Sequence, residues 1–462
     1  MQMNFLKQRV LSFVVSLALF MEAMDATILN TAIPTMAKNF NVNPIDLKIA
    51  LISYLLMLAI VIPISGWLAD KLGAKKVFII ALTIFIIASF FCGLSSHLLE
   101  LIIARSIQGI GGALTLPVGR LIIVRTFKHR QFINAMNQIV TVGAFGMMLG
   151  PVLGGIITYH FSWHWIFWIN VPVGLLAIFL TKYFLKDISP VAVPPLDKIG
   201  FLLFATSLSG LMFGLSALSE TILNRHISLF IILASFILIL IYFWHSKDKK
   251  NPVVKISLFY NRIFQIAISG NFLSRLSFGS MPFLLPLLLQ IKLHYSAQLS
   301  GIVLAPLAGG VLLAKQFSLR LLQKQGFKKY LLINTLLAGI AIWLFMLIKI
   351  STSIYIIALL TLFFGLMISL QYSGMNALAY ADISTNDSGA ATSIMSTVQQ
   401  FSQSMGVAIS ALLVNYFSFG SYLKISAFTN TFFFLGFIVL SSSFVFMRLK
   451  STDGIQMIHS DE

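Results

Sequence analysis

Long runs of apolar residues alternate with short polar segments along almost the whole chain. Fourteen of these runs approach or exceed the length of about 20 residues that a helix needs to cross the ~30 Å hydrocarbon layer of a membrane. They lie at residues 10–37, 48–69, 77–97, 99–121, 134–158, 165–185, 199–219, 227–245, 263–290, 298–319, 330–350, 353–380, 390–416 and 428–448. The pattern predicts an all-α polytopic membrane protein with 14 transmembrane helices and both chain ends on one side.

The composition agrees with a chain that lies mostly in lipid. Hydrophobic residues make up 58% and charged residues 10%, whereas about a quarter of a soluble globular domain is charged. The single cysteine, Cys92, excludes a disulfide framework and a cysteine-based metal site. The first apolar run follows Lys7 and Arg9, as in a secretion signal, but it is longer and contains two acids. We therefore expect it to remain as the first spanning helix.

The positive charges predict the orientation in the membrane. A net charge of +18 would suggest nucleic-acid binding in a soluble protein. Here 23 of the 32 lysines and arginines fall on the N-terminal side of the predicted membrane and six on the other side. The remaining three, Arg105, Arg120 and Arg275, lie within or at the ends of spans. Because cytoplasmic loops carry the excess of Lys and Arg, both termini are predicted to be cytoplasmic, and no nucleic-acid partner is expected.

Two carboxylates, Glu22 and Asp25, lie inside the first apolar run. A charge at the centre of a spanning helix costs about 2.5–3.5 kcal/mol on insertion scales, so it is rarely there without a function. Their i, i+3 spacing puts both on one helix face, where two ionised acids would repel each other. The pair therefore predicts a proton site. The alternative is that Glu22 reaches the membrane interface and Asp25 has a structural partner.

The chain contains an internal repeat. Leu68–Lys76 and Leu321–Lys329 match at a leucine, a lysine, a glycine and the final Lys-Lys pair. Repeated halves are typical of secondary transporters, which bind substrate near the membrane midplane between them. We predict an N-terminal six-helix bundle in 1–188, two additional transmembrane helices with cytoplasmic linkers in 189–262, and a C-terminal six-helix bundle in 263–462.

The segment after the second apolar run reads Gly66-Trp-Leu-Ala-Asp-Lys-Leu-Gly-Ala-Lys-Lys76. Glycines permit a tight turn and close helix approach, and an acid here can pair with the basic loop or with a helix N-terminus. Such contacts can hold one side shut in one state and break in the other. The segment resembles the loop between helices 2 and 3 of the major facilitator superfamily. The resemblance predicts a cytoplasmic gate formed by Gly66, Asp70, Gly73, Lys75 and Lys76. The second copy has Gln323 in place of the acid, so we expect the gating charge in the first half only.

Arg105 lies in the fourth apolar run and is followed by small residues suited to close helix packing. A buried guanidinium needs a carboxylate or a polar cluster, and Glu22 and Asp25 are the only acids well inside the predicted spans. Arg105 is similar to the helix-4 arginine of the superfamily, which is implicated there in proton handling. Together with the proton site predicted from the two acids, this resemblance leads us to expect that Asp25, Glu22 and Arg105 couple transport to protons. A purely structural ion pair is the alternative.

A glycine-rich motif, G-x-x-x-G-P-x-x-G-G, lies in the fifth apolar run. A proline inside a helix removes a backbone hydrogen bond, and the glycines allow close packing. The motif resembles the antiporter motif of helix 5, which marks exporters in this superfamily. Its residues are Gly146, Gly150, Pro151, Gly154 and Gly155.

Further motifs resemble the drug:proton antiporters with 14 spanning helices, in particular the bacterial multidrug-transporter subgroup. They are the run Ser162–Gly174, the segment Pro117–Arg120 and the pattern of Asp25, Thr27, Ile28, Asn30, Ala32 and Pro34. The family usually has an uncharged residue where Glu22 stands. Whether Glu22 carries a second proton, recognises a cation or is incidental stays open.

Substrate-cavity candidates are fewer. An arginine inside a span, such as Arg275, should face a water-filled cavity or a partner and not lipid. It can bind an anionic group of the substrate or pair with Asp25. The neutral polar residues Asn30, Gln371 and Asn376 are further candidates, although many such side chains serve helix packing.

We predict a proton-coupled secondary antiporter that exports amphipathic small molecules by alternating access, which is multidrug efflux. The expected partners are the substrate, protons and the lipid bilayer, with the chain as a monomer in the bacterial cytoplasmic (inner) membrane. One alternative is a dedicated exporter of a specific metabolite such as a siderophore, and another is a non-transporting membrane sensor. No reactive cluster or phosphate-binding loop is present in the sequence, so we expect no enzyme activity, no cofactor and no metal.

Overall fold

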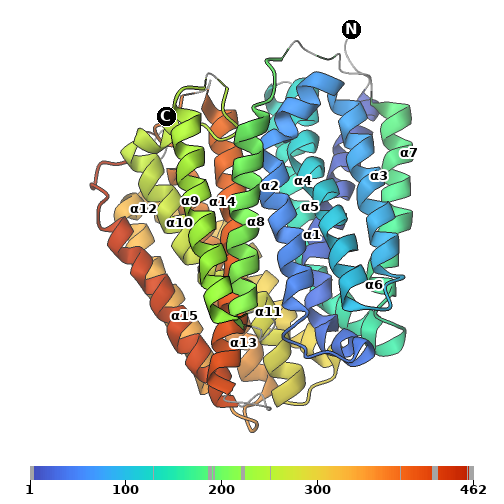
Figure 1. The fold of residues 1–462 in the computed structure, drawn as a ribbon, viewed down its shortest axis with the longest axis vertical. Coiled ribbons are helices and arrows are strands. Elements are labelled where there is room, and N and C mark those ends of the chain that lie inside the picture. The colour runs from blue at the N-terminus through green and yellow to red at the C-terminus, as the bar shows by residue number, and fades with distance from the viewer. Residues whose placement is uncertain are drawn as a thin grey trace. The chain divides into compact units, whose positions relative to one another are not determined.

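The computed structural model describes residues 5–127, 129–185, 190, 193–219, 224–249, 251–384, 387–418, 425–454 and 456. Its elements are helices throughout these ranges, with no strand, which confirms the all-α prediction (Figure 1). The chain divides into two compact units. Unit 1 comprises Met1–Leu196 with Ser296–Ile302, and unit 2 comprises Asp197–Tyr295 with Val303–Glu462.

The most extensive helix packing in unit 1 is between α1 and α5, between α4 and α2, and between α4 and α3. The bounds of its helices are α1 Phe5–Phe40, α2 Lys48–Leu72, α3 Ala74–Cys92, α4 Leu98–Thr126, α5 His129–His160, α6 Trp165–Trp168 and α7 Asn170–Phe184. Because α1 packs on α5, α7 and α4, it lies at the centre of this unit. The helix with the two predicted acids is therefore buried in protein rather than exposed to lipid.

In unit 2, α10 contacts α13, α14 and α15. The bounds of the α-helices are α8 Lys198–Ser219, α9 Arg225–Lys247, α10 Arg262–Phe278, α11 Met281–Leu287, α12 Ala297–Leu344, α13 Ile354–Leu378, α14 Ser388–Ser418 and α15 Ile425–Phe446. The start of α12, up to Ile302, belongs to unit 1. Two short 3-10 helices, Ile256–Tyr260 and Phe345–Leu347, and one π-helical turn, Leu288–Lys292, complete it. The helix that carries Arg275 is therefore enclosed by three others.

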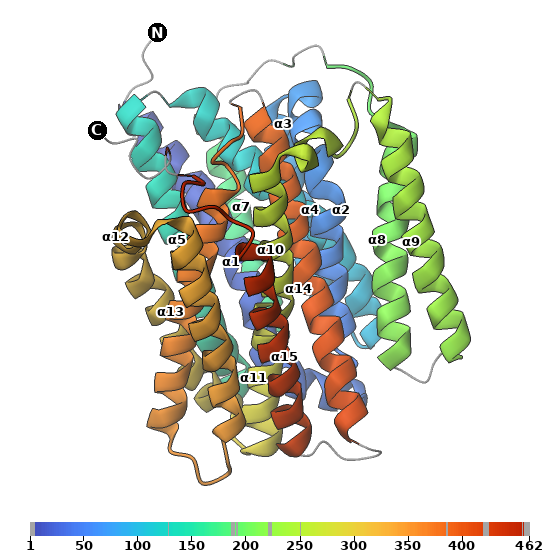
Figure 2. The ribbon, with the colours of Figure 1, turned by 90° about the vertical axis from the view of Figure 1, so that its left-hand side faces the viewer.

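The helices α8 and α9 form a pair of their own, and Figure 2 shows them side by side. They correspond to the two additional spans predicted in 189–262. Within unit 2, α8 also contacts α14, where the hydroxyl of Ser404 lies 3.1 Å from the sulfur of Met212. By contrast, the outer face of α9 carries large exposed apolar side chains such as Phe230, Leu233 and Leu240. An apolar outer face of this kind suits contact with lipid.

Twelve helices in the described part of the chain are long and apolar enough to cross a membrane. One of them runs over 51 residues, Ala297–Leu347, which at 1.5 Å per residue is about 75 Å, more than twice the hydrocarbon thickness. Gly326 interrupts it with a non-helical backbone (φ 69°, ψ 162°). The 31-residue helix α14 is rich in serine, threonine and glutamine and lies outside the twelve. The total of 14 spans therefore stays a prediction.

The two copies of the sequence repeat share one backbone feature. Gly73 separates α2 from α3 with φ 90°, and the aligned Gly326 divides α12 with φ 69°. Both values lie in the left-handed region that side chains with a Cβ rarely adopt. A glycine is thus required at the same position of both copies, where the chain turns from one long helix into the next.

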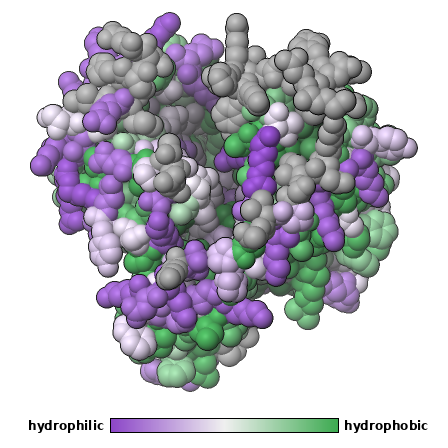
Figure 3. All heavy atoms as spheres, turned by 90° about the horizontal axis from the view of Figure 1, so that it is seen from above, coloured by the Kyte–Doolittle hydropathy of each residue, from purple (hydrophilic) through white to green (hydrophobic). Residues whose placement is uncertain are grey.

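Apolar and polar side chains occupy different parts of the surface. Large exposed apolar residues lie along the helices, for example Phe91, Phe179 and Leu359. The face of the molecule seen from above in Figure 1 carries many hydrophilic side chains (Figure 3). This distribution is typical of a protein whose helices face hydrocarbon and whose helix ends face water.

The close packing of α5 on α1 depends on glycine. A Cβ at Gly154 would overlap the backbone oxygen of Ile28, whereas Gly143 on the same helix has no atom within 4 Å of that position. We expect Gly154→Ala to lower the free energy of unfolding by about 1–3 kcal/mol through overpacking. The control Gly143→Ala should be neutral or stabilising by up to about 1 kcal/mol. Unfolding of the purified variants in detergent checks this, and equal effects at the two positions would contradict the packing.

Candidate functional site

Small residues of α4 bring three helices of unit 1 close together. A Cβ at Gly109 would lie 2.7 Å from the backbone oxygen of Tyr54 on α2, and one at Gly111 would lie 2.7 Å from the backbone nitrogen of Phe85 on α3. Glycine is therefore needed at both positions. This close approach lets side chains from α2, α3 and α4 meet around Arg105.

Asp25 and Arg105 form a buried ion pair. The side chains of both residues are at most 1% exposed, and Nη1 of Arg105 lies 2.6 Å from Oδ2 of Asp25. The guanidinium carbon also lies 4.2 Å from the ring centroid of Tyr54, which permits a cation–π interaction. Each charge thus compensates the other in an environment where an unpaired one would be strongly destabilising.

Two side-chain amides complete the surroundings of the carboxylate. Nε2 of Gln108 donates to Oδ1 of Asp25 at 3.0 Å, and Nδ2 of Asn170 donates to the same oxygen at 2.8 Å. Oε1 of Gln108 in turn accepts from Nη1 of Arg105 at 2.8 Å. Asn170 also donates to the hydroxyl of Ser89, 3.1 Å away. We call Asp25, Arg105, Gln108 and Asn170 the Asp25 cluster. Three hydrogen bonds from three side chains thus reach the two oxygens of Asp25.

The amides of the Asp25 cluster were not predicted from the sequence. Gln108 follows Arg105 by one helical turn, and Asn170 lies inside the Ser162–Gly174 motif. Both were therefore visible as parts of motifs. A neutral amide inside a span has many possible uses, however, so no sequence signal assigned them to the carboxylate.

Glu22 lies outside this hydrogen-bonded cluster. Its side chain is buried, with the residue 9% exposed, and Oε2 has no hydrogen-bond partner among the described residues. It interacts electrostatically with Arg120 and more weakly with Asp25. The two acids therefore share a helix face, as predicted, but have different partners.

The glycine-rich motif of α5 lies directly against α1, the helix that carries Asp25. A Cβ at Gly146 would lie 2.6 Å from the backbone oxygen of Phe20, and Cβ atoms at Gly150 and Gly154 would overlap Thr27 and Ile28. Three glycines one turn apart thus let α5 pack along α1. The remaining motif residues, Pro151 and Gly155, contact Gly301 and Ala297 at the start of α12, in the part of that helix that belongs to unit 1.

The predicted gate residues lie at the junction of α2 and α3. Asp70 forms an ion pair with Arg125 in the last turn of α4. Gly73 supplies the left-handed turn, Lys75 is half-buried and Lys76 is exposed. Gly66 is exposed and has no atom within 4 Å of a Cβ position, so it takes no part in close packing.

A second contact joins this junction to the segment after α7. Nε1 of Trp67 donates to the backbone oxygen of Pro194 at 2.8 Å, and the ammonium of Lys71 lies 4.5 Å from the Trp67 ring centroid. This ion pair and this hydrogen bond are among the contacts that hold the predicted gate segment. Both can break without leaving a deeply buried charge, because Asp70 and Arg125 are about one-third exposed.

The neutral substrate-cavity candidates are already hydrogen-bonded within their own units. Nδ2 of Asn30 donates to the backbone oxygen of Thr27 one turn earlier in α1. Gln371 is fully buried and uses both ends of its amide, accepting from Asn334 and donating to Thr335. Asn376 accepts from Gln399 of α14 at 3.1 Å. Their roles in substrate binding stay predictions.

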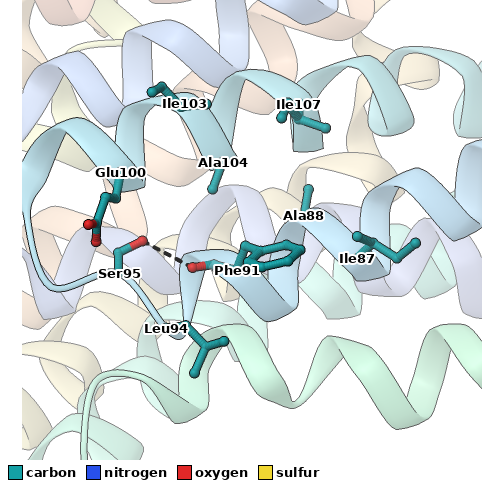
Figure 4. A pocket seen from close by; sticks show the side chains of 9 residues that line it. All are labelled: Ile87, Ala88, Phe91, Leu94, Ser95, Glu100, Ile103, Ala104 and Ile107. Atoms are coloured by element: carbon teal, nitrogen blue, oxygen red, sulfur yellow. Dashed lines mark hydrogen bonds between the residues drawn. The ribbon is translucent and has the colours of Figure 1, made fainter.

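An apolar groove of about 460 Å³ lies between α3 and α4 (Figure 4). Its lining residues are Ile87, Ala88, Phe91, Leu94, Ser95, Glu100, Ile103, Ala104 and Ile107. Several of them, including Phe91 and Ile103, are more than half exposed on the outer surface of the helices. The carboxylate of Glu100 already accepts from the backbone of Ser96 and His97. The groove thus offers an apolar surface to lipid and no convergent polar groups of the kind found in ligand sites.

A chain of long apolar helices that buries an ion pair inside one of two compact units is a polytopic membrane protein of the transporter class. Its sequence matches the family model of the Major Facilitator Superfamily over residues 15–407 and 267–455. The chain belongs to this superfamily and is a membrane transporter of small molecules, not an enzyme.

Relatives and solved structures agree with this assignment. The chain is 38% identical to the "Probable transport protein HsrA" of Haemophilus influenzae, over 96% of this chain and 97% of that protein. It is 32% identical to the "Putative multidrug resistance protein MdtD" of Shigella flexneri, over 95% and 94%. The fold is similar to that of a D-xylose-proton symporter, with a TM-score of 0.69, 14% identity and coverage of 96% and 98%. The nucleoside transporter NupG gives a TM-score of 0.62 and 14% identity, with coverage of 96% and 100%. The predicted major facilitator fold is confirmed.

The buried Asp25–Arg105 pair should contribute to the free energy of unfolding. Asp25→Asn and Arg105→Gln should each lower the free energy of unfolding by about 3–5 kcal/mol, because each leaves one buried charge unpaired. The double variant should cost less than the sum of the two, with a coupling of up to about 3 kcal/mol. Unfolding of the four proteins in detergent checks this.

The Asp70–Arg125 pair, in which both side chains are about one-third exposed, is the control. Asp70→Asn should cost no more than about 1 kcal/mol, as is usual for exposed pairs. Additive effects of Asp25→Asn and Arg105→Gln would contradict a direct ion pair between them.

Proposed function

We propose that this transporter is a proton-coupled antiporter that exports amphipathic small molecules from the cytoplasm of a bacterium. The proposal rests on the Asp25 cluster. The carboxylate of Asp25 lies in a spanning helix, is fully buried, and is bound by Arg105 and by the amides of Gln108 and Asn170. A buried ionisable residue in a membrane span is most often part of a transport pathway or a proton relay. In this cluster Asp25 is the proton acceptor and Arg105 stabilises its ionised form.

Coupling follows from what a proton does to the cluster. Protonation of Asp25 removes its negative charge and leaves the Arg105 guanidinium without a counter-charge. The two protonation states therefore favour different arrangements of α1 and α4. Substrate and proton drive transport only if they bind the alternative arrangements with different affinities, because equal affinities shift no population.

The glycine motif on α5 supports export as the direction. It packs on the same helix that carries Asp25, so a change at the cluster acts directly on the α1–α5 interface. Glycine contacts permit sliding or bending without side-chain clashes, and Pro151 removes one backbone hydrogen bond from α5. A relative described as a putative multidrug resistance protein supports the same direction and a broad substrate range.

The Asp70–Arg125 pair serves as the cytoplasmic latch in this proposal. It joins the end of α2 to the end of α4, and α4 also carries Arg105. An exposed pair of this kind contributes little free energy, so it can open and close during each cycle. Lys75 and Lys76 supply the positive loop charge on that side. Both termini are then cytoplasmic, and the chain works as a monomer in the cytoplasmic membrane.

The domain organisation in this proposal follows the sequence prediction. Residues 1–188 and 263–462 form the two bundles that alternate around the substrate, and 189–262 insert the helices α8 and α9. Two other functions compete with multidrug export. One is export of a single metabolite such as a siderophore, and the other is a sensor without transport.

Proton antiport can be measured in everted membrane vesicles with an acridine dye that is quenched when respiration acidifies the interior. A panel of amphipathic cations, anions and neutral compounds is added in turn. For wild type we expect at least one compound to restore fluorescence as protons leave in exchange for it. Asp25→Asn should reduce this response to background, because no proton can be exchanged at residue 25.

Glu100→Gln provides the matched control, since Glu100 is exposed and bound to its own helix start; it should respond like wild type. Glu22→Gln tests whether a second acid is needed. An unchanged response in Asp25→Asn would overturn the coupling site. No response of wild type to any compound would favour a single-metabolite exporter or a sensor.

A further inference from the structure

Among the described residues each unit has one buried arginine, and the two arginines differ in their partners. Arg105 in unit 1 has the carboxylate of Asp25 at 2.6 Å. Arg275 in unit 2 is only 5% exposed, but no carboxylate lies within 4 Å of it among the described residues. Asp25, which the sequence analysis offered as a possible partner of Arg275, already accepts hydrogen bonds from three side chains in unit 1.

The contacts of Arg275 fix its direction without neutralising its charge. Nε donates to Oδ1 of Asn271, one turn earlier on α10, at 2.5 Å. The guanidinium carbon lies 3.7 Å from the ring centroid of Tyr372 on α13. The Tyr372 side chain is in turn hydrogen-bonded to Gln403 of α14. Three helices of unit 2 thus hold the guanidinium in one place.

One donor beside Arg275 is unsatisfied among the described residues. Asn271 is fully buried, and because its Oδ1 accepts from Arg275, the amide orientation is determined. Its Nδ2 has no hydrogen-bond partner in the described residues. Buried polar groups are almost always hydrogen-bonded, and a buried charge without a counter-charge is strongly unfavourable. One cation and one unsatisfied donor at the same place call for an acceptor that carries negative charge.

Two further aromatic rings continue from Tyr372 through ring contacts. Phe278 packs edge-on against Tyr372 with ring centroids 5.7 Å apart, and Phe364 lies beyond it at 6.1 Å from Phe278. Bidentate pairing with a carboxylate is the geometry that a guanidinium favours. The combination suits a molecule with a carboxylate on an apolar, aromatic body.

We propose that Arg275 and Asn271, with Tyr372 as the aromatic platform, bind the carboxylate of the transported molecule. This inference rests on the proposed export function and narrows its substrate class to amphipathic carboxylates, including zwitterions. Arg275 supplies the charge and two Nη donors, Nδ2 of Asn271 supplies one further donor, and Phe278 belongs to the apolar wall.

Binding can be measured without transport or a proton gradient. Purified protein in lipid nanodiscs is titrated with 1-pyrenebutyrate and, in parallel, with 1-pyrenebutanol, which has the same ring system and an alcohol in place of the carboxylate. Empty nanodiscs give the background. We expect wild type to bind the butyrate at least about tenfold more tightly than the butanol, because hydrogen bonds to charged groups are worth this much.

Variants assign the preference to this site. Arg275→Gln should lower butyrate affinity at least about tenfold and leave butanol affinity unchanged. The butyrate affinity of Arg275→Lys should lie between those of wild type and Arg275→Gln, since lysine keeps the charge but lacks the planar guanidinium group. Arg262→Gln, on the same helix but bound to Asp453 in an exposed pair, is the matched control and should bind like wild type.

Asn271→Asp covers the case in which Arg275→Gln does not fold. It places a carboxylate beside the guanidinium, so it should raise the melting temperature and abolish the preference for butyrate. Equal binding of both probes by wild type, or a preference that survives Arg275→Gln or Asn271→Asp, would overturn the proposal. Because the assay needs no export, its failure is separate from a failure of proton antiport in vesicles.

Discussion

The structure of unit 1 depends on one ion pair in a place where an unpaired charge is hardly tolerated. The side chains of Asp25 and Arg105 are at most 1% exposed to solvent. Either charge alone would be strongly unfavourable there. The surrounding sequence follows from this constraint. Glycines on α4 allow α2 and α3 to approach the arginine, and Gln108 and Asn170 satisfy the second carboxylate oxygen. Any change in the protonation of Asp25 must therefore be accommodated by several helices together.

Several sequence motifs that lie far apart along the chain are connected through this ion pair. The helix α1 carries the acid, α5 packs on α1 through its glycines, and α4 joins the arginine at one level to the Asp70–Arg125 pair at another. In unit 2, Arg275 has no such counter-charge among the described residues, which is why we assign it to a ligand.

Much of this organisation could be predicted from the sequence because charges are scarce in its spans. Arg105 had few acids to pair with, so its association with the first helix followed almost by elimination, and the repeat located the glycine turn at both Gly73 and Gly326. Neutral residues gave no such signal. Gln108 and Gln371 are both buried amides, yet one binds the carboxylate of Asp25 and the other joins α12 to α13. Only the three-dimensional packing separates them, because an amide is equally suited to either role.

In the proposed mechanism Asp25 changes its protonation state during transport, and infrared difference spectroscopy of the reconstituted protein can detect this change. A spectrum recorded on adding a transported compound should show loss of a carboxylic-acid C=O band and gain of carboxylate bands. We expect this change to be absent in Asp25→Asn and retained in Glu100→Gln. A wild-type spectrum without carboxyl bands, or one that Asp25→Asn leaves unaltered, would contradict it.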